Sequence, residues 1–310
     1  MEVASMLEMI SAELVKALRK KRFWLLFAII AIIVPLVQVI SAGFLSGRVS
    51  SALAESATVS RAISEIASPY SLARNHVGGT LQALLYVLAA IVAVFIVGED
   101  RTYKMWKTIL VAQPNRLRVL SAKFLSGMLI LLIMIVGGLL GALLFGSISI
   151  ALGYATTFAG DWGNLLGITM LQWLVLAAPL ALGFLISWLT VSPAIAVIGV
   201  IFMPAILETI VTALMALTVN RITPLTAAFE AQRIQQNVEA MRHYFFTPNV
   251  GIGSRLLGET IKGFGIGGSS DVIPVMDWNQ IWVSAGIAAV YFAIFAGVLV
   301  WNFTTRDVHD

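Results

Sequence analysis

Cysteine is absent from this chain of 310 residues, and only three histidines are present. The absence of cysteine excludes a disulfide scaffold, a thiolate metal site and a cysteine nucleophile. Three histidines offer little for an imidazole metal site, so we predict neither a metal site nor catalytic residues. Charged residues are also scarce, at 12% against about a quarter in ordinary globular chains. This shortage argues against a water-soluble domain.

Long apolar runs take the place of the missing charge. Hydrophobic residues make up 59% of the chain, and its mean hydropathy is +0.92. A membrane-spanning helix needs roughly 20 mostly apolar residues, and six runs come close to that length. We therefore predict an all-α polytopic membrane protein, with residues 1–310 forming one transmembrane domain. Its predicted spans are residues 23–44, 81–98, 124–146, 165–189, 193–217 and 278–301.

The placement of lysine and arginine predicts the orientation. Basic residues precede the first run and crowd the link 99–123 between the second and third runs. The positive-inside rule places both segments in the cytoplasm, and an even number of spans returns the C-terminus there. We expect a multi-pass protein of the cytoplasmic membrane with both termini inside. The net charge of +4 is then explained by topology, and no nucleic-acid partner is predicted.

Residues 1–22 are predicted to form a cytoplasmic interfacial helix. Leu7, Ile10, Leu14 and Leu18 recur at helical spacing. Such a helix can lie in the headgroup plane with its basic face towards anionic lipid, which makes membrane lipid a predicted partner. A simple basic anchor before the first span is the alternative. The basic residues concerned are Lys16, Arg19, Lys20, Lys21 and Arg22.

Two segments are predicted outside the cell. Residues 220–277 read as an extracytoplasmic segment with a helix over 224–244. Its glycine-rich stretch 251–268 is either a re-entrant element or a flexible loop. The other outer segment is residues 46–79, and we expect its end to be extended or turn-forming at residues 68–70 and 78–79. Only residues 190–192 separate the fourth and fifth spans, and Pro193 is expected to restart the helix.

The link 99–123 is the most informative segment. An acidic pair leaves the second span, a basic and aromatic helix of about two turns follows, and Gln-Pro-Asn-Arg then forms a turn. We interpret this link as a short helix that presents its charges and an exposed Trp106 to another subunit, because interfaces favour aromatic residues and arginine. A loop that serves topology alone is the alternative. The docking residues proposed are Glu99, Asp100, Arg101, Thr102, Lys104, Trp106, Pro114 and Arg116.

This link resembles the signature of type-2 ATP-binding-cassette (ABC) permeases. The matching features are Glu99, the pair Arg101-Thr102, the turn Pro114-Asn115-Arg116 and Lys123. Arg101 stands where glycine is commoner in that family. The resemblance implies a coupling helix over 99–113 that sits in a groove of a cytosolic ABC ATPase, with the N-terminal helix alongside. It also implies two permease copies, as a homodimer or with a related chain, and two ATPase subunits.

The nucleotide is expected in the partner. A Walker A loop ends in Gly-Lys-Ser/Thr, and no lysine in this chain follows a glycine. The chain is therefore predicted to bind no cofactor and to have no enzymatic activity of its own, while ATP and Mg²⁺ belong to the ATPase subunit.

A few polar residues fall inside the predicted spans, where they are functional candidates by default. Gln38, Gln172, Glu208 and Thr212 are candidates for a translocation path. The glutamines could instead hydrogen-bond between helices. For Glu208 we favour a different role, that of capping an outer helix after a break at Pro204. In the third span Gly137 and Gly141 have the spacing of close helix packing.

The sequence thus favours the membrane-spanning subunit of an ATP-driven exporter that works by alternating access. Its substrate would be hydrophobic or amphiphilic: a drug, an antimicrobial peptide, a lipid or a glycan. The alternative is an accessory or scaffold subunit that couples the ATPase to an extracytoplasmic partner protein. An intramembrane enzyme is disfavoured, because His76, His243 and His309 all lie outside the predicted spans.

Overall fold

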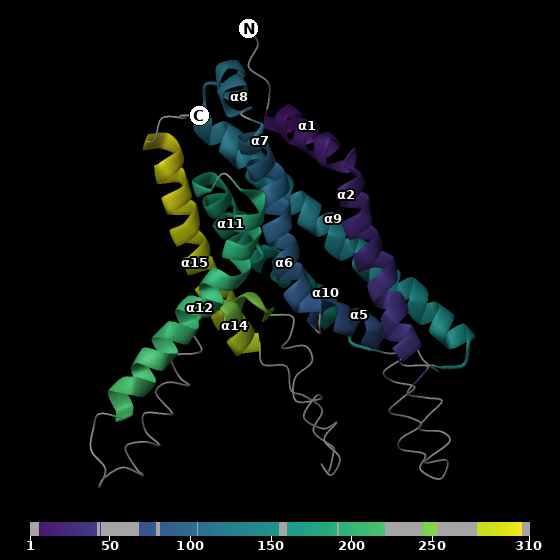
Figure 1. The fold of residues 1–310 in the computed structure, drawn as a ribbon. Coiled ribbons are helices and arrows are strands. Elements are labelled where there is room, and N and C mark those ends of the chain that lie inside the picture. The colour runs from purple at the N-terminus through teal and green to yellow at the C-terminus, as the bar shows by residue number, and fades with distance from the viewer. Residues whose placement is uncertain are drawn as a thin grey trace.

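A computed structural model describes residues 6–41, 44, 68–78, 81–103, 105–154, 160–190, 192–220, 244–252 and 278–305. Every regular element in these ranges is a helix. The helices form an elongated bundle in which α1, α7 and α8 lie together at one end, while α5, α14 and the outer part of α12 lie towards the other (Figure 1). The predicted all-α class is confirmed.

Five helices in the described ranges are long and apolar enough to cross a membrane. They coincide with five of the six predicted spans. The remaining one, residues 81–98, is also helical, as α6 (Leu81–Ala93) and the π-helix η2 (Val94–Gly98). The polytopic class is therefore confirmed, and the count of six stays a prediction. The five are Lys21–Ser41, Arg116–Ala151, Trp162–Leu189, Pro193–Leu214 and Trp278–Thr305.

The N-terminal helix is shorter than predicted. Helix α1 covers Met6–Leu18 and α2 covers Lys21–Ala28. Lys20 between them has an extended backbone, with φ −81° and ψ 127°, so the chain bends there. Lys21 and Arg22 belong to the first span and not to the interfacial helix. The basic residues Lys20, Lys21 and Arg22 continue through the bend, so they do not mark the end of the helix.

The first span packs closely against the long helix α9 (Arg116–Ala151). A π-helix, η1 (Ile29–Ile33), lies in this span just before Pro35, which has no N–H to give the carbonyl of Ala31. That carbonyl faces Gly141, where an added Cβ would lie 1.9 Å from its oxygen. The predicted close packing at Gly141 is confirmed, as it is at Gly137, where a Cβ would collide with the ring of Phe27.

The extended or turn-forming stretch expected at residues 68–70 is wrong, because helix α5 (Pro69–Gly78) begins there. Residue 79 of the second expected turn lies outside the described residues. The Ser68 side chain accepts a hydrogen bond from the N–H of Ser71 at 3.2 Å, and Pro69 occupies the first helical position, where its missing N–H costs nothing. Helix α5 packs on α9, with the buried His76 against Gly138. Serine and proline therefore begin a helix here.

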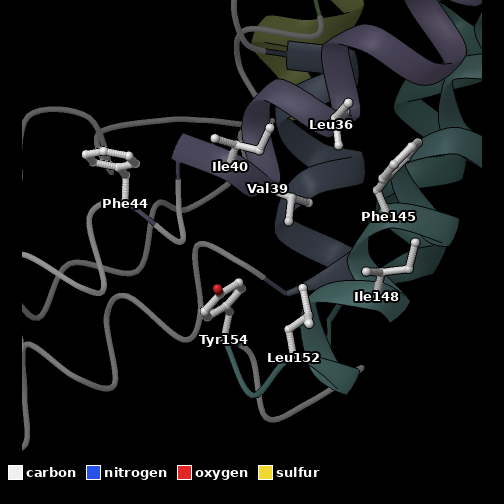
Figure 2. Close-up of a pocket in the computed structure, with 8 residues that line it drawn as sticks. All are labelled: Leu36, Val39, Ile40, Phe44, Phe145, Ile148, Leu152 and Tyr154. Carbon is white, nitrogen blue, oxygen red and sulfur yellow. The ribbon is translucent and has the colours of Figure 1, made fainter.

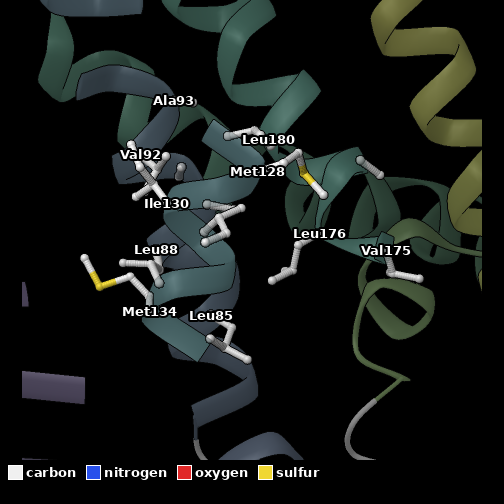
Figure 3. Packing of buried hydrophobic residues seen from close by; sticks show 14 of the residues in the cluster. Leu85, Leu88, Val92, Ala93, Met128, Ile130, Met134, Val175, Leu176 and Leu180 are labelled. Carbon is white, nitrogen blue, oxygen red and sulfur yellow. The ribbon is translucent and has the colours of Figure 1, made fainter. Parts of the chain in front are cut away.

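The fourth span consists of α10 (Trp162–Val175) and α11 (Ala177–Leu189). Pro179 explains the break, because it cannot donate to the carbonyl of Val175. Helix α11 is the centre of the core, and its residues 178–188 are all buried. Leucine and methionine side chains of α6 and α9 pack beside it (Figure 3).

Helix α12 (Pro193–Asn220) begins at the proline that the sequence predicts, after a connection of three residues. It continues through Pro204 without a break. The Tyr86 hydroxyl of α6 donates to the carbonyl of Val200 at 2.6 Å. That carbonyl is the one Pro204 leaves without its helical N–H, so a neighbouring side chain makes the proline tolerable.

Two further helices follow, α14 (Phe246–Val250) and α15 (Trp278–Thr305). Helix α14 packs on α15 and also contacts α12. The helix predicted over 224–244 and most of the glycine-rich stretch 251–268 lie outside the described residues.

Candidate functional site

The two ends of the described bundle differ in character. At one end, α1 lies against α9 and beside α7 (Glu99–Thr102), which continues directly from η2 (Figure 1). Six charged side chains meet there, and we call them the charged cluster. They are Glu13, Lys16, Lys20, Glu99, Asp100 and Lys123.

Asp100 and Lys123 are the centre of this cluster. Asp100 is fully buried and Lys123 is 2% exposed. The Lys123 Nζ donates to one Asp100 oxygen and to Glu13, while the Lys16 Nζ donates to the other Asp100 oxygen. Buried charges are costly unless paired and hydrogen-bonded, and these are both. The arrangement fixes α1, α7 and α9 to one another.

The remaining members lie at the edge. The Lys20 Nζ donates to Glu99, and Arg22 approaches the same carboxylate at 3.8 Å. Lys16 lies 3.7 Å from Glu13. Burial by itself would lower the pKa of Lys16, but the hydrogen bond to Asp100 and the charges of Glu13, Asp100 and Glu99 together raise it above its ordinary value of 10.5. Lys16 is thus a permanent cation.

These contacts change the predicted role of the basic residues. The N-terminal helix does lie alongside the link, as the resemblance implies. Lys16 and Lys20, however, face the acidic pair and not lipid, so the expected orientation of the basic face is wrong for them. The pairs join residues 79 to 110 positions apart, which no local pattern indicates. Arg19, Lys21 and Arg22 remain exposed.

The predicted exposure of Trp106 is also wrong. Trp106 begins α8 (Trp106–Ala112) and is 2% exposed. Its ring centre lies 5.3 Å from that of Trp188 at the end of α11 and 5.2 Å from that of Phe303 at the end of α15. The Lys123 Nζ lies 5.4 Å from the same ring. Trp106 therefore anchors α8 to two spans. The basic residues around Trp106 in the sequence do not indicate these partners, which are distant along the chain.

Two predicted docking residues take part in the same anchorage. The Arg101 guanidinium lies 5.4 Å from the Trp188 ring, a cation–π distance. Arg116, at the start of α9, donates to the Phe303 carbonyl at 3.2 Å. The Thr102 hydroxyl, at the end of α7, donates to the Gly98 carbonyl at the end of η2. Lys104 lies outside the described residues.

Four large apolar side chains of the link are exposed, among polar neighbours such as Lys107 and Arg118, and we call these four the link surface. It consists of Tyr103, Met105, Val111 and Leu117, which are 72%, 43%, 83% and 47% exposed. Pro114 is exposed as well and separates α8 from α9, as predicted, with Asn115 capping α9 through the Arg118 N–H. Exposed apolar side chains outside the spans are candidates for contact with another protein. The sequence interpretation missed them because it weighted charge and tryptophan.

The polar residues inside the spans do not converge on one point. Gln172 donates to the Val250 carbonyl at 2.9 Å, and Glu208 accepts from the Thr247 N–H at 2.8 Å, so both contact α14. Thr212 donates to the Glu208 backbone. Gln38 lies in the first span, away from them. The cap expected after a Pro204 break is wrong, since Glu208 instead accepts from the first turn of α14.

An apolar pocket of about 500 Å³ lies at the end of the bundle away from the charged cluster. It opens between the first span and the far end of α9, and the Tyr154 hydroxyl is its one labelled polar group (Figure 2). Its volume falls within the range of about 300–1,000 Å³ typical of small-molecule sites. The lining consists of Leu36, Val39, Ile40, Phe44, Phe145, Ile148, Leu152 and Tyr154.

These features define a multi-pass helical membrane protein with a short structured link fastened across the end of its bundle. The chain belongs to the ABC-2 family of transporter proteins, whose family model matches residues 9–207. This match covers α1, the link and the spans through the middle of α12. No curated protein and no solved structure matches the chain. The protein is therefore a membrane permease component of an ABC transporter, a class that associates with an ABC ATPase.

Proposed function

We propose that this chain is the membrane-spanning subunit of an ATP-driven exporter of the cytoplasmic membrane, which moves a hydrophobic or amphiphilic molecule by alternating access. The observation that carries the proposal is the construction of the link. Its inner side is fixed by the charged cluster and Trp106, and its outer side offers the exposed, apolar link surface. A segment held rigidly on one side and open on the other is suited to receive force from a second protein.

The contacts of the link suggest how such force would travel. Trp106 packs between Trp188 and Phe303, so a displacement of α8 would act on α11 and α15. The Asp100–Lys123 pair would pass the same displacement to α1 and α9. Packed interfaces favour discrete arrangements over gradual deformation. Closure of the ATPase subunits would therefore shift whole helices between inward-open and outward-open states.

The proposed assembly contains two permease copies and two ATPase subunits, with ATP and Mg²⁺ bound by the latter. Helices α12 and α15 support a lateral neighbour, because both leave most of their apolar surface exposed in the single chain. A second copy would cover part of that surface and lipid the rest. The apolar pocket in Figure 2 supports a hydrophobic or amphiphilic cargo.

Replacement of Val111 tests the docking proposal. Val111→Asp places a charge at the most exposed side chain of the link surface, and we expect the ATPase to be lost from the complex purified in mild detergent. Leu152→Asp is the matched control, because Leu152 is 59% exposed at the opposite end of α9, and it should retain the ATPase at a one-to-one ratio. An unchanged ATPase content in Val111→Asp would refute the proposed docking surface.

A further inference from the structure

Glu208 is a carboxylate in an unusual position. It is the single acidic residue within the six predicted spans, and it is the sixteenth residue of α12. Carboxylates at such positions are rare and usually functional. Glu208 is half-buried, and within the described part of the chain it forms no ion pair.

Aromatic rings lie next to the segment that binds this carboxylate. Glu208 accepts from the Thr247 N–H, and the neighbouring Phe246 ring lies 5.1 Å from Tyr291 and 5.5 Å from Phe295, measured between ring centres. The Tyr86 ring of α6 lies 6.1 Å from the same Phe246 ring. The aromatic residues thus come from α6, α14 and α15, and α14 also supplies the N–H that Glu208 accepts.

The hydroxyls of these tyrosines are already used. Tyr86 donates to Val200 and Tyr291 donates to the Tyr244 carbonyl at 3.1 Å. They therefore contribute ring faces to their surroundings. Phe246 is buried, whereas Tyr291 and Phe295 are half-buried and Tyr244 is 65% exposed. The carboxylate and part of the aromatic surface are accordingly both accessible in the single chain.

A carboxylate beside accessible aromatic rings is suited to bind an organic cation. An ammonium or phosphonium group is attracted both by the negative charge and by the faces of aromatic rings, and its apolar substituents suit a site within a membrane span. A backbone N–H satisfies one acceptor position of Glu208 but does not neutralise its charge. An anion would be repelled, and a neutral molecule would leave the charge unmatched.

We propose that Glu208, with the rings of Tyr291, Phe295 and Tyr244, forms a binding site for bulky organic cations. This inference names the substrate class of the exporter and in that respect rests on the proposed function. Binding itself is a property of the permease chain, and it is measured without an ATPase. A failure of the cation site would therefore leave the coupling experiment with Val111 unaffected.

The test uses tetraphenylphosphonium and tetraphenylborate, which have nearly the same size and shape and opposite charge. Purified full-length permease in phosphatidylglycerol nanodiscs should bind the phosphonium saturably, and the borate should not compete. Glu208→Gln keeps an acceptor for the Thr247 N–H but removes the charge, so we expect phosphonium affinity to fall about tenfold or more. Absent phosphonium binding, equal binding by Glu208→Gln or competition by the borate would overturn the proposal.

Matched variants separate the contributions to binding of the Glu208 charge and of the Tyr291 ring from general effects on the protein. Asp161→Asn removes one negative charge at the start of α10, where the side chain caps Asn164, and should bind as the wild type does. Tyr291→Phe keeps the ring and should also bind normally, whereas Tyr291→Leu should weaken binding. Equal binding by Tyr291→Phe and Tyr291→Leu would show that the ring takes no part and would overturn the aromatic component.

Two sources of cation share this chemistry, a soluble drug-like molecule and the choline headgroup of a lipid. Two further nanodisc titrations separate them, both with the same phosphatidylglycerol content and hence the same surface charge, the remaining lipid being phosphatidylcholine in one and phosphatidylethanolamine in the other. Weaker apparent phosphonium affinity with phosphatidylcholine supports a site that choline lipid occupies, and equal affinity supports a soluble cation. Weakening that also occurs in Glu208→Gln, to the same extent, would mean that choline competes elsewhere and would contradict the site.

Discussion

Asp100 and Glu208 are both carboxylates on helices of the bundle, yet their surroundings differ completely. Asp100 is fully buried and its two oxygens accept from Lys16 and Lys123. Glu208 is half-buried and accepts from a single backbone N–H, that of Thr247. A carboxylate whose charge is matched within the chain stabilises the fold. One whose charge is unmatched by the described residues is open to a ligand.

The aromatic clusters beside the two carboxylates show the same contrast. Trp106, Trp188 and Phe303 are buried together at the charged end. Near Glu208, the rings of Tyr291 and Phe295 are only half-buried. We therefore assign the first region to force transmission and the second to recognition, and the following variants test that division.

The largest expected difference is in stability, between Asp100→Asn and Glu208→Gln. Asp100→Asn removes the buried charge that Lys16 and Lys123 share and leaves both lysines with Glu13 alone, and breaking such a buried network typically costs about 3–5 kcal/mol. Glu208→Gln keeps its acceptor and should cost less than about 1 kcal/mol. Thermal unfolding in one detergent compares the two directly. Equal melting temperatures would erase the distinction between the regions.

A second comparison contrasts closely packed and open helix faces. In Gly141→Ala the new methyl group would meet the Ala31 carbonyl, and relieving such a clash typically costs about 1–3 kcal/mol. Gly286 on α15 has nothing within 4 Å of an added Cβ, so Gly286→Ala should be neutral or stabilising by up to roughly 1 kcal/mol. Thermal unfolding of both variants in the same detergent measures this difference in stability. A stable Gly141→Ala would mean that the first span and α9 do not approach as described.

The smallest effect on stability is expected for Glu99→Gln, which should instead affect the coupling of ATP hydrolysis to transport. Glu99 pairs with Lys20 at the edge of the charged cluster, where an ion pair contributes about 1 kcal/mol or less. Glu99→Gln should therefore unfold almost normally but hydrolyse ATP without transport, because the link would lose its contact with Lys20 at the start of the first span. Charge reversal in Arg116→Glu should uncouple likewise. ATPase and transport assays on reconstituted complexes are the measurement, and normal export by both variants would contradict the coupling role.

The spans were largely predictable because their apolar runs and the charged links between them are local features. Five of them appear where the sequence places them, and Pro193 begins α12 as expected. The errors arose where a residue's effect depends on a distant neighbour. Pro204 does not break α12 because Tyr86 supplies the missing hydrogen bond. At Ser68 and Pro69 a local helix-start signal was present and was read as a turn.

The site was predictable in its location but not in its contacts. The acidic pair and the turn at Pro114 mark the link, whereas the partners of Asp100 and Trp106 come from α1, α9, α11 and α15. A tryptophan among basic residues gives no indication of burial. The exposure of Val111 follows only once the buried side of α8 is known.

Cross-linking from the link tests the central claim most directly. The chain has no cysteine, so Val111→Cys and Leu152→Cys each introduce a unique thiol. We expect a cross-linker on the residue 111 thiol to capture the ATPase in an ATP-hydrolysing complex, with a yield that changes between nucleotide-free and ATP-bound states, and residue 152 to capture none. A fully active complex in which residue 111 never reaches the ATPase would contradict the account.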